Sequence, residues 1–418
     1  MLAWIKEYQK AIVYIITIVS VVAIPFYIRS LEIFSKAGGG FVDLRVTLLA
    51  GQRIFNHELI YNAQDIAQDM PYLYAPCFAY VMGLYRIIIT PERLAIFIWF
   101  LSCYLFLGLI LKLSLHITEE TYEKNSHPWF FYPVLLFLCF RYFLSNIQLG
   151  QINIFLDFLL LLSLYFLYHK REFLSGALLA IATLIKLPFL IFILFFLFQK
   201  KWKALFSFFI TALILLFSPA LHLGWHENLF FLTQWKSTLA TKSSVILNFK
   251  NQSLISFYAR GLHFLFKDME FQKLYTYSYL LSIFTAIPLL ISSTIIYFFK
   301  EKTKWIKFFG LASCFMIFMV ILSPSAWRAT FIHLLFPYCF ILMYWWNREK
   351  KCPFIPRLLI LSFVLSSFIT GDLFGGSLNT FIHQTSFIFI SSLVVLYLLF
   401  IIPSRIRAQQ DSNLQPSD

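Results

Sequence analysis

Charged residues are scarce in this chain. Asp, Glu, Lys and Arg make up 13% of its 418 residues, whereas apolar residues make up 60% and aromatic residues 20%. Soluble domains carry about 25% charged and 45–50% apolar residues. This shortage of charge, together with a mean hydropathy of +0.76, excludes an ordinary soluble protein and predicts an all-α polytopic membrane protein.

Motifs that hold metals or nucleotides are also lacking. The chain has no zinc motif, no Asp-x-Asp and no Gly-rich phosphate loop at a strand–helix junction. Its six cysteines are scattered, with neither metal-ligand spacing nor the pattern of a disulfide framework: Cys77, Cys103, Cys139, Cys314, Cys339 and Cys352. We therefore expect no metal, no cofactor and no soluble nucleotide-binding domain.

Basic residues outnumber acidic ones, and the net charge is +14. In a membrane protein such an excess holds cytoplasmic loops in place, and part of it can meet phosphate on the other side of the bilayer. We therefore expect the lipid bilayer, and no nucleic acid, as a partner.

Long apolar runs fill most of the sequence. Runs bounded by charge predict twelve membrane spans: 11–28, 93–116, 129–147, 151–168, 173–186, 187–199, 204–221, 275–299, 306–323, 329–346, 354–371 and 384–402. They form a single integral domain, 1–402, followed by a short tail, 403–418, that we expect to be cytoplasmic and disordered. The run 76–89 is short for a hydrocarbon core of about 30 Å, so we predict a juxtamembrane or half-inserted helix there.

The positive charges predict the orientation. Short loops on one side carry half of the 34 lysines and arginines: Lys6, Lys10, Lys124, Lys170, Arg171, Lys200, Lys201, Lys203, Lys300, Lys302, Lys304, Lys307, Arg348, Lys350, Lys351, Arg405 and Arg407. The positive-inside rule makes this side cytoplasmic. We therefore expect a multi-pass protein of the cell (inner) membrane with both termini cytoplasmic and the loops 29–92 and 222–274 extracytoplasmic.

The segment 173–199 has two interpretations. A single helix kinked at Pro188 would leave Lys186 in the middle of the membrane, which is costly. Two short helices that meet at a corner formed by Lys186–Pro188 keep the flanking basic residues on one side. We predict the second arrangement, with Lys186 outside.

Asp43, in the first external loop, is our predicted catalytic base. It follows the glycines 38–40, which let the backbone fold back on the membrane surface. The alternative is that Asp43 caps the N-terminus of a helix that begins in the sequence VDLRV. The sequence alone does not decide between the two.

Other polar residues are predicted to lie on the same face as Asp43. They are the amides Gln148, Gln151, Asn153, Asn251 and Gln252, and the cations Lys186 and Arg328. The amides either join helices or contact a ligand, and the cations either snorkel to the interface or bind phosphate. Asp157, inside a predicted span, is expected to face the interior of the bundle.

In this order, several motifs resemble one family. The residues that carry the resemblance are Asp43, Ala50, LIY (59–61), YLYAP (72–76), LGQINIFLDFLLLL, SGALLAIATLIKLPFLIF, NQSLISFYAR and LSPSAWRATFIHLLFP. They resemble the polyprenol-phosphate-mannose-dependent α-mannosyltransferases of glycosyltransferase family 87, in the GT-C superfamily. The similarity extends over about residues 43–337.

The chain departs from the family pattern at a few places. The tyrosine common after the loop aspartate is missing from LRVT, and the glycine common before LY is missing from NHELIY. Ala75 replaces a common proline, and Arg328-Ala329 replaces His-His. The last change puts a fixed cation where the family has imidazoles, so we expect a difference in sugar or acceptor specificity.

The resemblance implies a GT-C bundle of about twelve transmembrane helices with juxtamembrane helices in the first external loop. It also implies that a hexose, mannose in the family, moves with inversion from a polyprenyl-phosphate donor to a glycan or glycolipid acceptor. Asp43 would be the base, and Lys186, Arg260 and Arg328 would meet the donor phosphate. Tyr74 and Trp327 would stack on the sugar.

Two other functions remain open at this stage. A transporter or flippase of lipid-linked sugars would show inverted repeats and charges near the middle of the membrane, and we find no repeat. A catalytically inactive GT-C relative would have the same sequence features as the enzyme.

Overall fold

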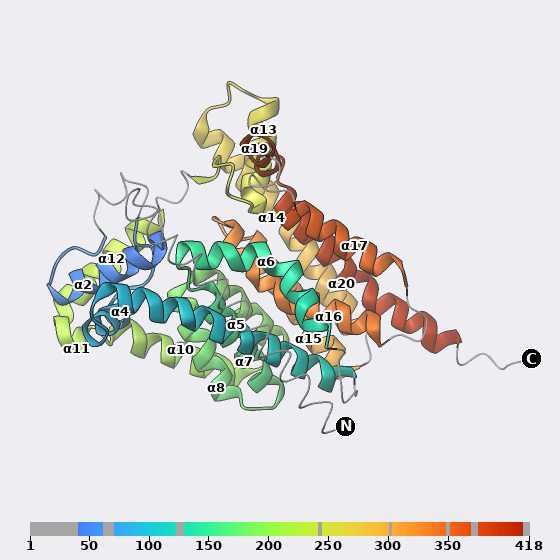
Figure 1. The fold of residues 1–418 in the computed structure, drawn as a ribbon, viewed down its shortest axis with the longest axis horizontal. Coiled ribbons are helices and arrows are strands. Elements are labelled where there is room, and N and C mark those ends of the chain that lie inside the picture. The colour runs from blue at the N-terminus through green and yellow to red at the C-terminus, as the bar shows by residue number, and fades with distance from the viewer. Residues whose placement is uncertain are drawn as a thin grey trace, which may run out of the picture.

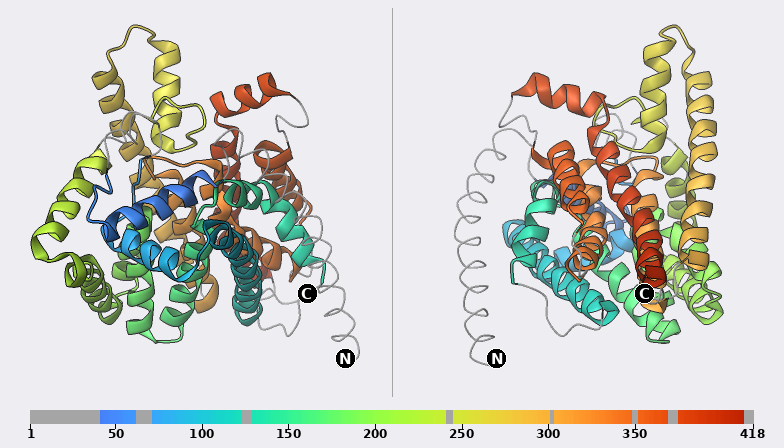
Figure 2. Two further views of the ribbon diagram at one scale, coloured as in Figure 1. Left: turned by 60° about the vertical axis from the view of Figure 1, so that its left-hand side comes forward. Right: turned by 90° about the vertical axis from the view of Figure 1, so that its right-hand side faces the viewer.

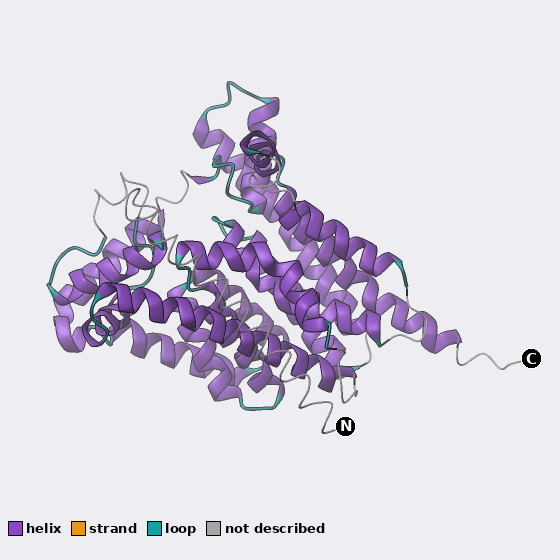
Figure 3. Cartoon of the chain, in the orientation of Figure 1, coloured by secondary structure: helices purple, strands orange, loops and turns teal. Residues whose placement is uncertain are grey.

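The structure is a computed structural model that describes residues 41–61, 71–122, 129–240, 245–300, 303–347, 352–368 and 375–412. These residues form helices joined by loops, and no strand occurs among them (Figure 3). The all-α prediction is therefore confirmed for this part of the chain. The predicted span 11–28 and part of the first external loop lie outside the described residues.

Among the described residues, six helices are long and apolar enough to cross a membrane, judged by length and composition. They are formed by α5 (Glu92–Tyr122), α6 (Phe131–Leu149), α10 with α11 (Trp202–Phe217, Ala220–Leu223), α14 with η3 (Phe271–Ile295, Ile296–Lys300), α15 (Lys304–Ile321) and η4 with α16 (Arg328–Leu334, Leu335–Trp346). A seventh results if α19 (Gly376–Gln384) and α20 (Phe387–Ser412), which meet at a bend of 54°, are one span. The chain is thus a membrane protein with several apolar helices.

Other predicted spans are helical but shorter. They are α7 (Asn153–Tyr168), α8 (Glu172–Ile185), η1 with α9 (Leu187–Ile191, Phe192–Phe198) and α17 with η5 (Phe354–Phe363, Val364–Phe368). A helix of 16 residues is about 24 Å long, less than a hydrocarbon core of about 30 Å. The total of twelve spans therefore stays a prediction.

The segment 173–199 forms a helical hairpin. The Lys201 ammonium lies 3.2 Å from the Glu172 carboxylate, so the start of α8 and the end of α9 are neighbours. Ser207 on α10 donates a hydrogen bond to the carbonyl of Phe173. The prediction of two helices that meet at Lys186–Pro188 is confirmed, and the kinked single helix is excluded.

Helix α2 (Val42–Phe55) crosses α4 (Pro76–Ile88) closely. A Cβ added at Gly51 would lie 2.4 Å from the backbone nitrogen of Gly83, so only glycine permits this contact. The predicted short helix over 76–89 is confirmed. Whether it lies beside a membrane is a separate prediction.

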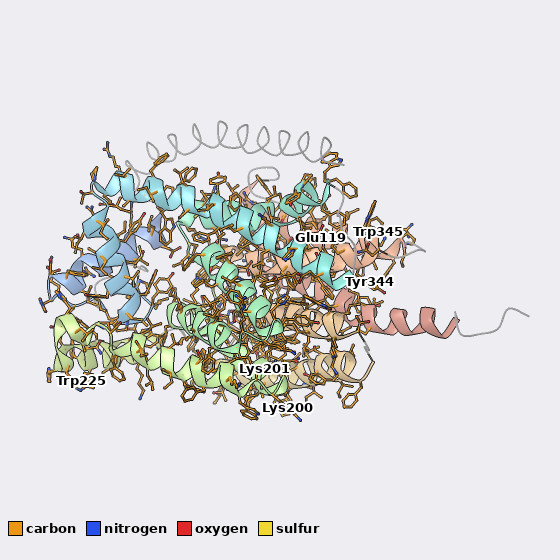
Figure 4. The ribbon with its side chains drawn as sticks, turned by 90° about the horizontal axis from the view of Figure 1, so that it is seen from below. Glu119, Lys200, Lys201, Trp225, Tyr344 and Trp345 are labelled. Carbon is orange, nitrogen blue, oxygen red and sulfur yellow. The ribbon has the colours of Figure 1, made fainter. Side chains whose placement is uncertain are left out.

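The two helices lie at one end of the molecule, beside α12 (Trp225–Ala240) (Figure 1). Trp225 marks this end in Figure 4, and the turn with Lys200 and Lys201 lies far from it along the bundle. Helices α13 (Leu254–Leu265) and α19 project from another edge of the bundle (Figure 2).

The centre of the bundle is formed by α15, η4 and α16. In each of their spans 83% of the residues are buried, compared with 11% in the span of α14. Asp157 on α7 is fully buried and lies 2.9 Å from Nδ1 of His333. The prediction that Asp157 faces the interior is confirmed. All six cysteines are free.

Candidate active site

Helix α2 is held in place by the end of α6. Its N-cap is Phe41, in the left-handed conformation with φ 53°, and no side chain caps the helix. The backbone N–H of Phe41 donates to the carbonyl of Gln148 at 3.0 Å. Asp43 is therefore in the first turn of α2 and not at its cap, so the capping interpretation is wrong.

Gly150, at the junction of α6 and α7, makes room for α2. Its φ of +69° is left-handed, and a Cβ at this position would lie 2.7 Å from Cβ of Leu44. Glycine is thus required both by the backbone conformation and by the close approach of the helix. After the turn it forms, Gln151 contacts Asp43 in the first turn of α2, and Asn153 contacts Lys186.

An amide bridges a carboxylate and an ammonium at this junction. Gln151 donates from Nε2 to Oδ2 of Asp43 at 2.6 Å, and its Oε1 accepts from Lys186 Nζ at 2.8 Å. A carboxylate accepts and an ammonium donates, so this pairing fixes the orientation of the amide. The carboxylate of Asp43 and the ammonium of Lys186 are thus joined through the amide of Gln151.

Lys186 is also tied to the interior of the bundle. Its ammonium donates to Oδ1 of Asn153 at 2.6 Å, and Asn153 donates to Oδ1 of Asn146 at 3.0 Å. Asn146 in turn donates to the carbonyl of Ala329 at 2.7 Å. These bonds join the α8 corner, the α6–α7 junction and η4 in one network, and they offset part of the cost of placing an ammonium there.

A cavity of about 150 Å³ opens onto this network. Five of the predicted site residues line it: Asp43, Tyr74, Gln151, Lys186 and Trp327. The ring of Tyr74 lies 5.9 Å from the Lys186 nitrogen, within the range of a cation–π contact. These five residues therefore present a carboxylate, a cation, an amide and two aromatic rings to one small volume.

Further residues that were not predicted as site residues also line the cavity. Trp235 on α12 lines it and donates from its indole to the carbonyl of Leu73 at 3.1 Å. Ser323, Ser325 and Thr330 line it as well. Trp235 lies in the predicted second external loop, where no motif marked it.

Burial raises the pKa of Asp43 above its usual 3.8, and the charge of Lys186 and the hydrogen bond from Gln151 partly offset the rise. A carboxylate with a raised pKa is a stronger base once it is ionised, and this suits a group that must accept a proton near neutral pH. No group of three or more His, Cys, Asp and Glu side chains that could hold a metal occurs among the described residues.

Other predicted site residues are placed differently. Gln148 is exposed, and its carbonyl accepts the hydrogen bond from Phe41. Asn251 is buried, accepts from the backbone of Ala326 at 2.9 Å and donates to the carbonyl of Pro324 at 2.9 Å. Gln252 donates to the carbonyl of His383. These contacts join loops, so ligand contact by the three amides stays a prediction.

Two of the three predicted phosphate ligands are not among the cavity-lining residues of the described chain. Arg328 donates to Nε2 of His383 at 2.7 Å. Arg260 donates to the carbonyl of Asn251 and to the hydroxyl of Ser386. Lys186 thus lies in the cavity with Asp43, whereas Arg328 and Arg260 contact His383 and Ser386.

We expect Gly150→Ala to displace α2 and lower activity. The left-handed φ costs an alanine about 1–2 kcal/mol, and the contact with Leu44 adds to this. Thermal unfolding and transfer rate measure the two effects. Gly224→Ala is the control for backbone strain without a close contact, since Gly224 (φ 80°, ψ 160°) has a conformation that disfavours alanine even more but open space around its Cβ position. Equal losses in both variants would assign the effect to backbone strain alone.

The comparison with known proteins gives one match. The sequence model of glycosyltransferase family 87 matches residues 72–324, which is more than half of the chain. No curated protein and no solved structure matches. Asp43 precedes the matched stretch, and Arg328 follows it. The chain belongs to glycosyltransferase family 87.

Proposed function

We propose that this protein is an inverting hexosyltransferase that moves mannose from a polyprenyl-phosphate donor to a glycan or glycolipid acceptor. Membership of the family supports a glycosyltransferase. The remainder of the proposal is supported by the polar cavity. In this cavity the Gln151 amide bridges the Asp43 carboxylate and the Lys186 ammonium, and apolar cavities adjoin it.

The apolar cavities fit the lipid part of such a donor. The polar cavity shares Leu187, Pro188, Leu239 and Ser323 with a cavity of about 310 Å³. That cavity shares Leu239, Leu322 and Pro324 with another of about 330 Å³, between α14 and the segment before α13. A polyprenyl phosphate has this character, since its phosphate is polar and its chain is hydrocarbon.

The two charged residues of the cavity, Asp43 and Lys186, have distinct roles in the proposed reaction. Asp43 accepts the proton of the acceptor hydroxyl as the oxygen attacks the anomeric carbon. The bond from that carbon to the phosphate oxygen breaks, and the polyprenyl phosphate leaves with the bonding electron pair. Lys186 stabilises the charge that develops on this phosphate. Attack opposite the leaving group inverts the anomeric carbon, and one carboxylate suffices as the base.

The aromatic side chains and the amide would hold the sugar. Tyr74, Trp235 and Trp327 line the cavity and offer faces on which a pyranose can stack. The indole N–H of Trp235 is already bonded to the carbonyl of Leu73, which fixes its ring. A cavity of about 150 Å³ is smaller than the roughly 300–1,000 Å³ usual for a drug-sized ligand, so we assign it to the sugar and the reacting oxygens.

We also propose that the cavity opens on the extracytoplasmic side of the cell membrane. Lys170, Lys200 and Lys201 lie at the ends of α7 and α9, opposite the corner that carries Lys186. The positive-inside rule then makes the Lys200 turn cytoplasmic and the Lys186 corner extracytoplasmic.

One experiment tests donor class and sidedness together. Purified protein should transfer sugar from a polyprenyl-phosphate mannose, ignore the matching nucleotide sugar, and be unaffected by a chelator. In sealed right-side-out vesicles, a short-chain water-soluble donor that does not cross the membrane should be used from outside. In inside-out vesicles the same donor should remain unused.

Two results would contradict the proposal. Efficient turnover of a nucleotide sugar without polyprenyl phosphate would overturn the donor class. Use of the impermeant donor in inside-out vesicles alone would place the site on the cytoplasmic side.

A further inference from the structure

Two buried asparagines form a chain of hydrogen bonds that ends at Lys186. Asn153 accepts from the Lys186 ammonium at 2.6 Å through its Oδ1, and its Nδ2 donates to Oδ1 of Asn146 at 3.0 Å. Both asparagines are fully buried, and neither is among the residues that line the cavity in the described chain. Any effect that they have on a ligand in the cavity therefore passes through their neighbours. We call this chain, from Lys186 through Asn153 to Asn146, the amide relay.

The far end of the amide relay is fixed by two backbone carbonyls. The Nδ2 of Asn146 donates to the carbonyl of Tyr142 at 2.8 Å and to the carbonyl of Ala329 at 2.7 Å. An amide nitrogen has two N–H donors, so both are used, and the oxygen of this amide must face Asn153. A rotated amide would bring its oxygen against two carbonyl oxygens. Asn153 must then donate to Asn146 from its nitrogen, which leaves its Oδ1 for Lys186.

A second amide oxygen contacts the same ammonium. Oε1 of Gln151 accepts from Lys186 at 2.8 Å, while Nε2 of Gln151 donates to Asp43 at 2.6 Å. Between Asp43 and Lys186 themselves, no ion pair occurs in the described part of the chain. The ammonium is thus bonded to two neutral amide oxygens, although a carboxylate lies across the Gln151 amide from it.

This arrangement needs an explanation, because a carboxylate is a stronger acceptor for an ammonium than an amide oxygen is. In a poorly solvated site the attraction between the two charges is stronger still. A move of Lys186 onto Asp43 would, however, leave Oδ1 of Asn153 buried without a donor, which is destabilising. Asn153 cannot regain a partner by turning its amide as long as Asn146 holds its nitrogen. The amide relay therefore opposes a direct ion pair.

The separation of the two charges matters for the proposed reaction. A carboxylate paired directly with an ammonium has a lower pKa and is a weaker base. The same pairing would neutralise the ammonium that stabilises the leaving phosphate. Asp43 also faces Tyr74, whose pKa is raised by burial and by the charge of Asp43, so that the phenol stays neutral under assay conditions. Lys186 is thus the side chain whose position decides how strong a base Asp43 is.

We propose that Asn146 is a positioning residue, which orients Asn153 so that Asn153 holds the Lys186 ammonium away from the Asp43 carboxylate. The two charges then serve different reactants, Asp43 the acceptor hydroxyl and Lys186 the donor phosphate. This division between reactants rests on the proposed function, whereas the effect of Asn146 on Asp43 rests on the hydrogen bonds alone. The sequence predicted Asn153 as a substrate ligand, and the amide relay assigns it a positioning role instead.

The protonation of Asp43 can be followed without sugar transfer. In the full-length protein, infrared difference titration detects the C=O stretch of its protonated carboxyl, which is assigned by its loss in Asp43→Asn. We expect Asn146→Leu, which keeps the approximate size of the side chain and removes its polar atoms, to let Lys186 pair with Asp43. The titration midpoint should then fall by about 1 pH unit or more. The transfer rate at neutral pH should fall by about tenfold or more.

The direction of the shift separates positioning from loss of structure. Lys186→Gln removes the charge and should raise the titration midpoint, whereas Asn146→Leu should lower it. In the double variant the midpoint should equal that of Lys186→Gln alone, because no ammonium is left to move. Asn228→Leu is the matched control, since Asn228 on α12 is a buried asparagine that donates to the carbonyl of Leu216 at 3.2 Å. It should lower the thermal stability and leave the titration of Asp43 unchanged.

An unchanged or raised midpoint in folded Asn146→Leu would overturn the positioning role, as would an equal fall in Asn228→Leu. If Asn146→Leu does not fold, Asn153→Ser makes the same test. It withdraws the amide oxygen from Lys186 with a smaller change in the core, and its midpoint should also fall; an unchanged midpoint there would overturn the proposal equally. A lowered midpoint in a protein that transfers no sugar would overturn the proposed function and leave the amide relay standing.

Discussion

Replacing Asp43 by asparagine is expected to abolish sugar transfer while the protein still folds and inserts. A positioned general base contributes about 10²–10⁴-fold to a rate, and the amide has no basicity to replace it. The amide oxygen of an asparagine can still accept the hydrogen bond that Gln151 donates at 2.6 Å. The bridge from Gln151 to Lys186 can therefore stay in place, so loss of activity would report chemistry and not collapse of the site.

The measurement is the transfer rate from a polyprenyl-phosphate sugar, with thermal unfolding as the check on folding. Glu58→Gln is the matched control, since Glu58 is an exposed carboxylate that accepts a hydrogen bond from the side chain of Asn56 and does not line the cavity. It should retain normal activity. Near-normal turnover by Asp43→Asn would assign the base to another carboxylate and remove the main support for the mechanism.

The sequence could predict that several cavity residues lie close together because a local pattern identifies each segment that carries them. Gln151 and Asn153 follow Gly150 at a helix junction, and Lys186 precedes Pro188 in an apolar segment. The cost of burying an ammonium was enough to choose the hairpin over a single helix. The ion pair between Lys201 and Glu172 agrees with that choice.

The sequence could not predict that Arg260 and Arg328 are absent from the cavity lining. Trp327 has extended backbone angles, with φ −81° and ψ 159°, and neighbouring side chains in extended segments point to opposite sides. Accordingly Ser323, Ser325 and Trp327 line the cavity, whereas Arg328 contacts His383. A one-residue difference decides which site a side chain joins, and only tertiary structure fixes that register.

Tertiary structure also determines that Phe41, and not Asp43, is the N-cap of α2. VDLRV has the pattern of a capped helix start, but α2 begins after Phe41, whose left-handed turn is bonded to the end of α6. That contact links residues about a hundred positions apart, so no local pattern contains it. It places Asp43 in the first turn of α2, where its carboxylate reaches Gln151.

Lys186→Gln is expected to reduce transfer by about 10²–10³-fold, the usual cost of removing one preorganised donor that stabilises developing charge. Glutamine keeps hydrogen-bonding ability toward Gln151 and Asn153, so the loss is mainly that of the positive charge. The missing charge acts on Asp43 as well. Burial raises the pKa of Asp43 above 3.8, and the charge of Lys186 lowers it again. Without Lys186 the pKa of Asp43 must rise further.

The direction of the pH effect follows from the role of Asp43. A base works only when it is ionised, so the wild-type rate falls as the pH drops through the pKa of Asp43. In Lys186→Gln this acid limb of kcat/KM should move to higher pH, and part of the lost activity should return in alkaline buffer.

Lys236→Gln, at an exposed lysine next to Trp235 on α12, removes the same charge outside the cavity and should leave the profile unchanged. An unshifted acid limb in Lys186→Gln would mean that Asp43 is not the group that titrates, and an unchanged rate would remove Lys186 from the donor site.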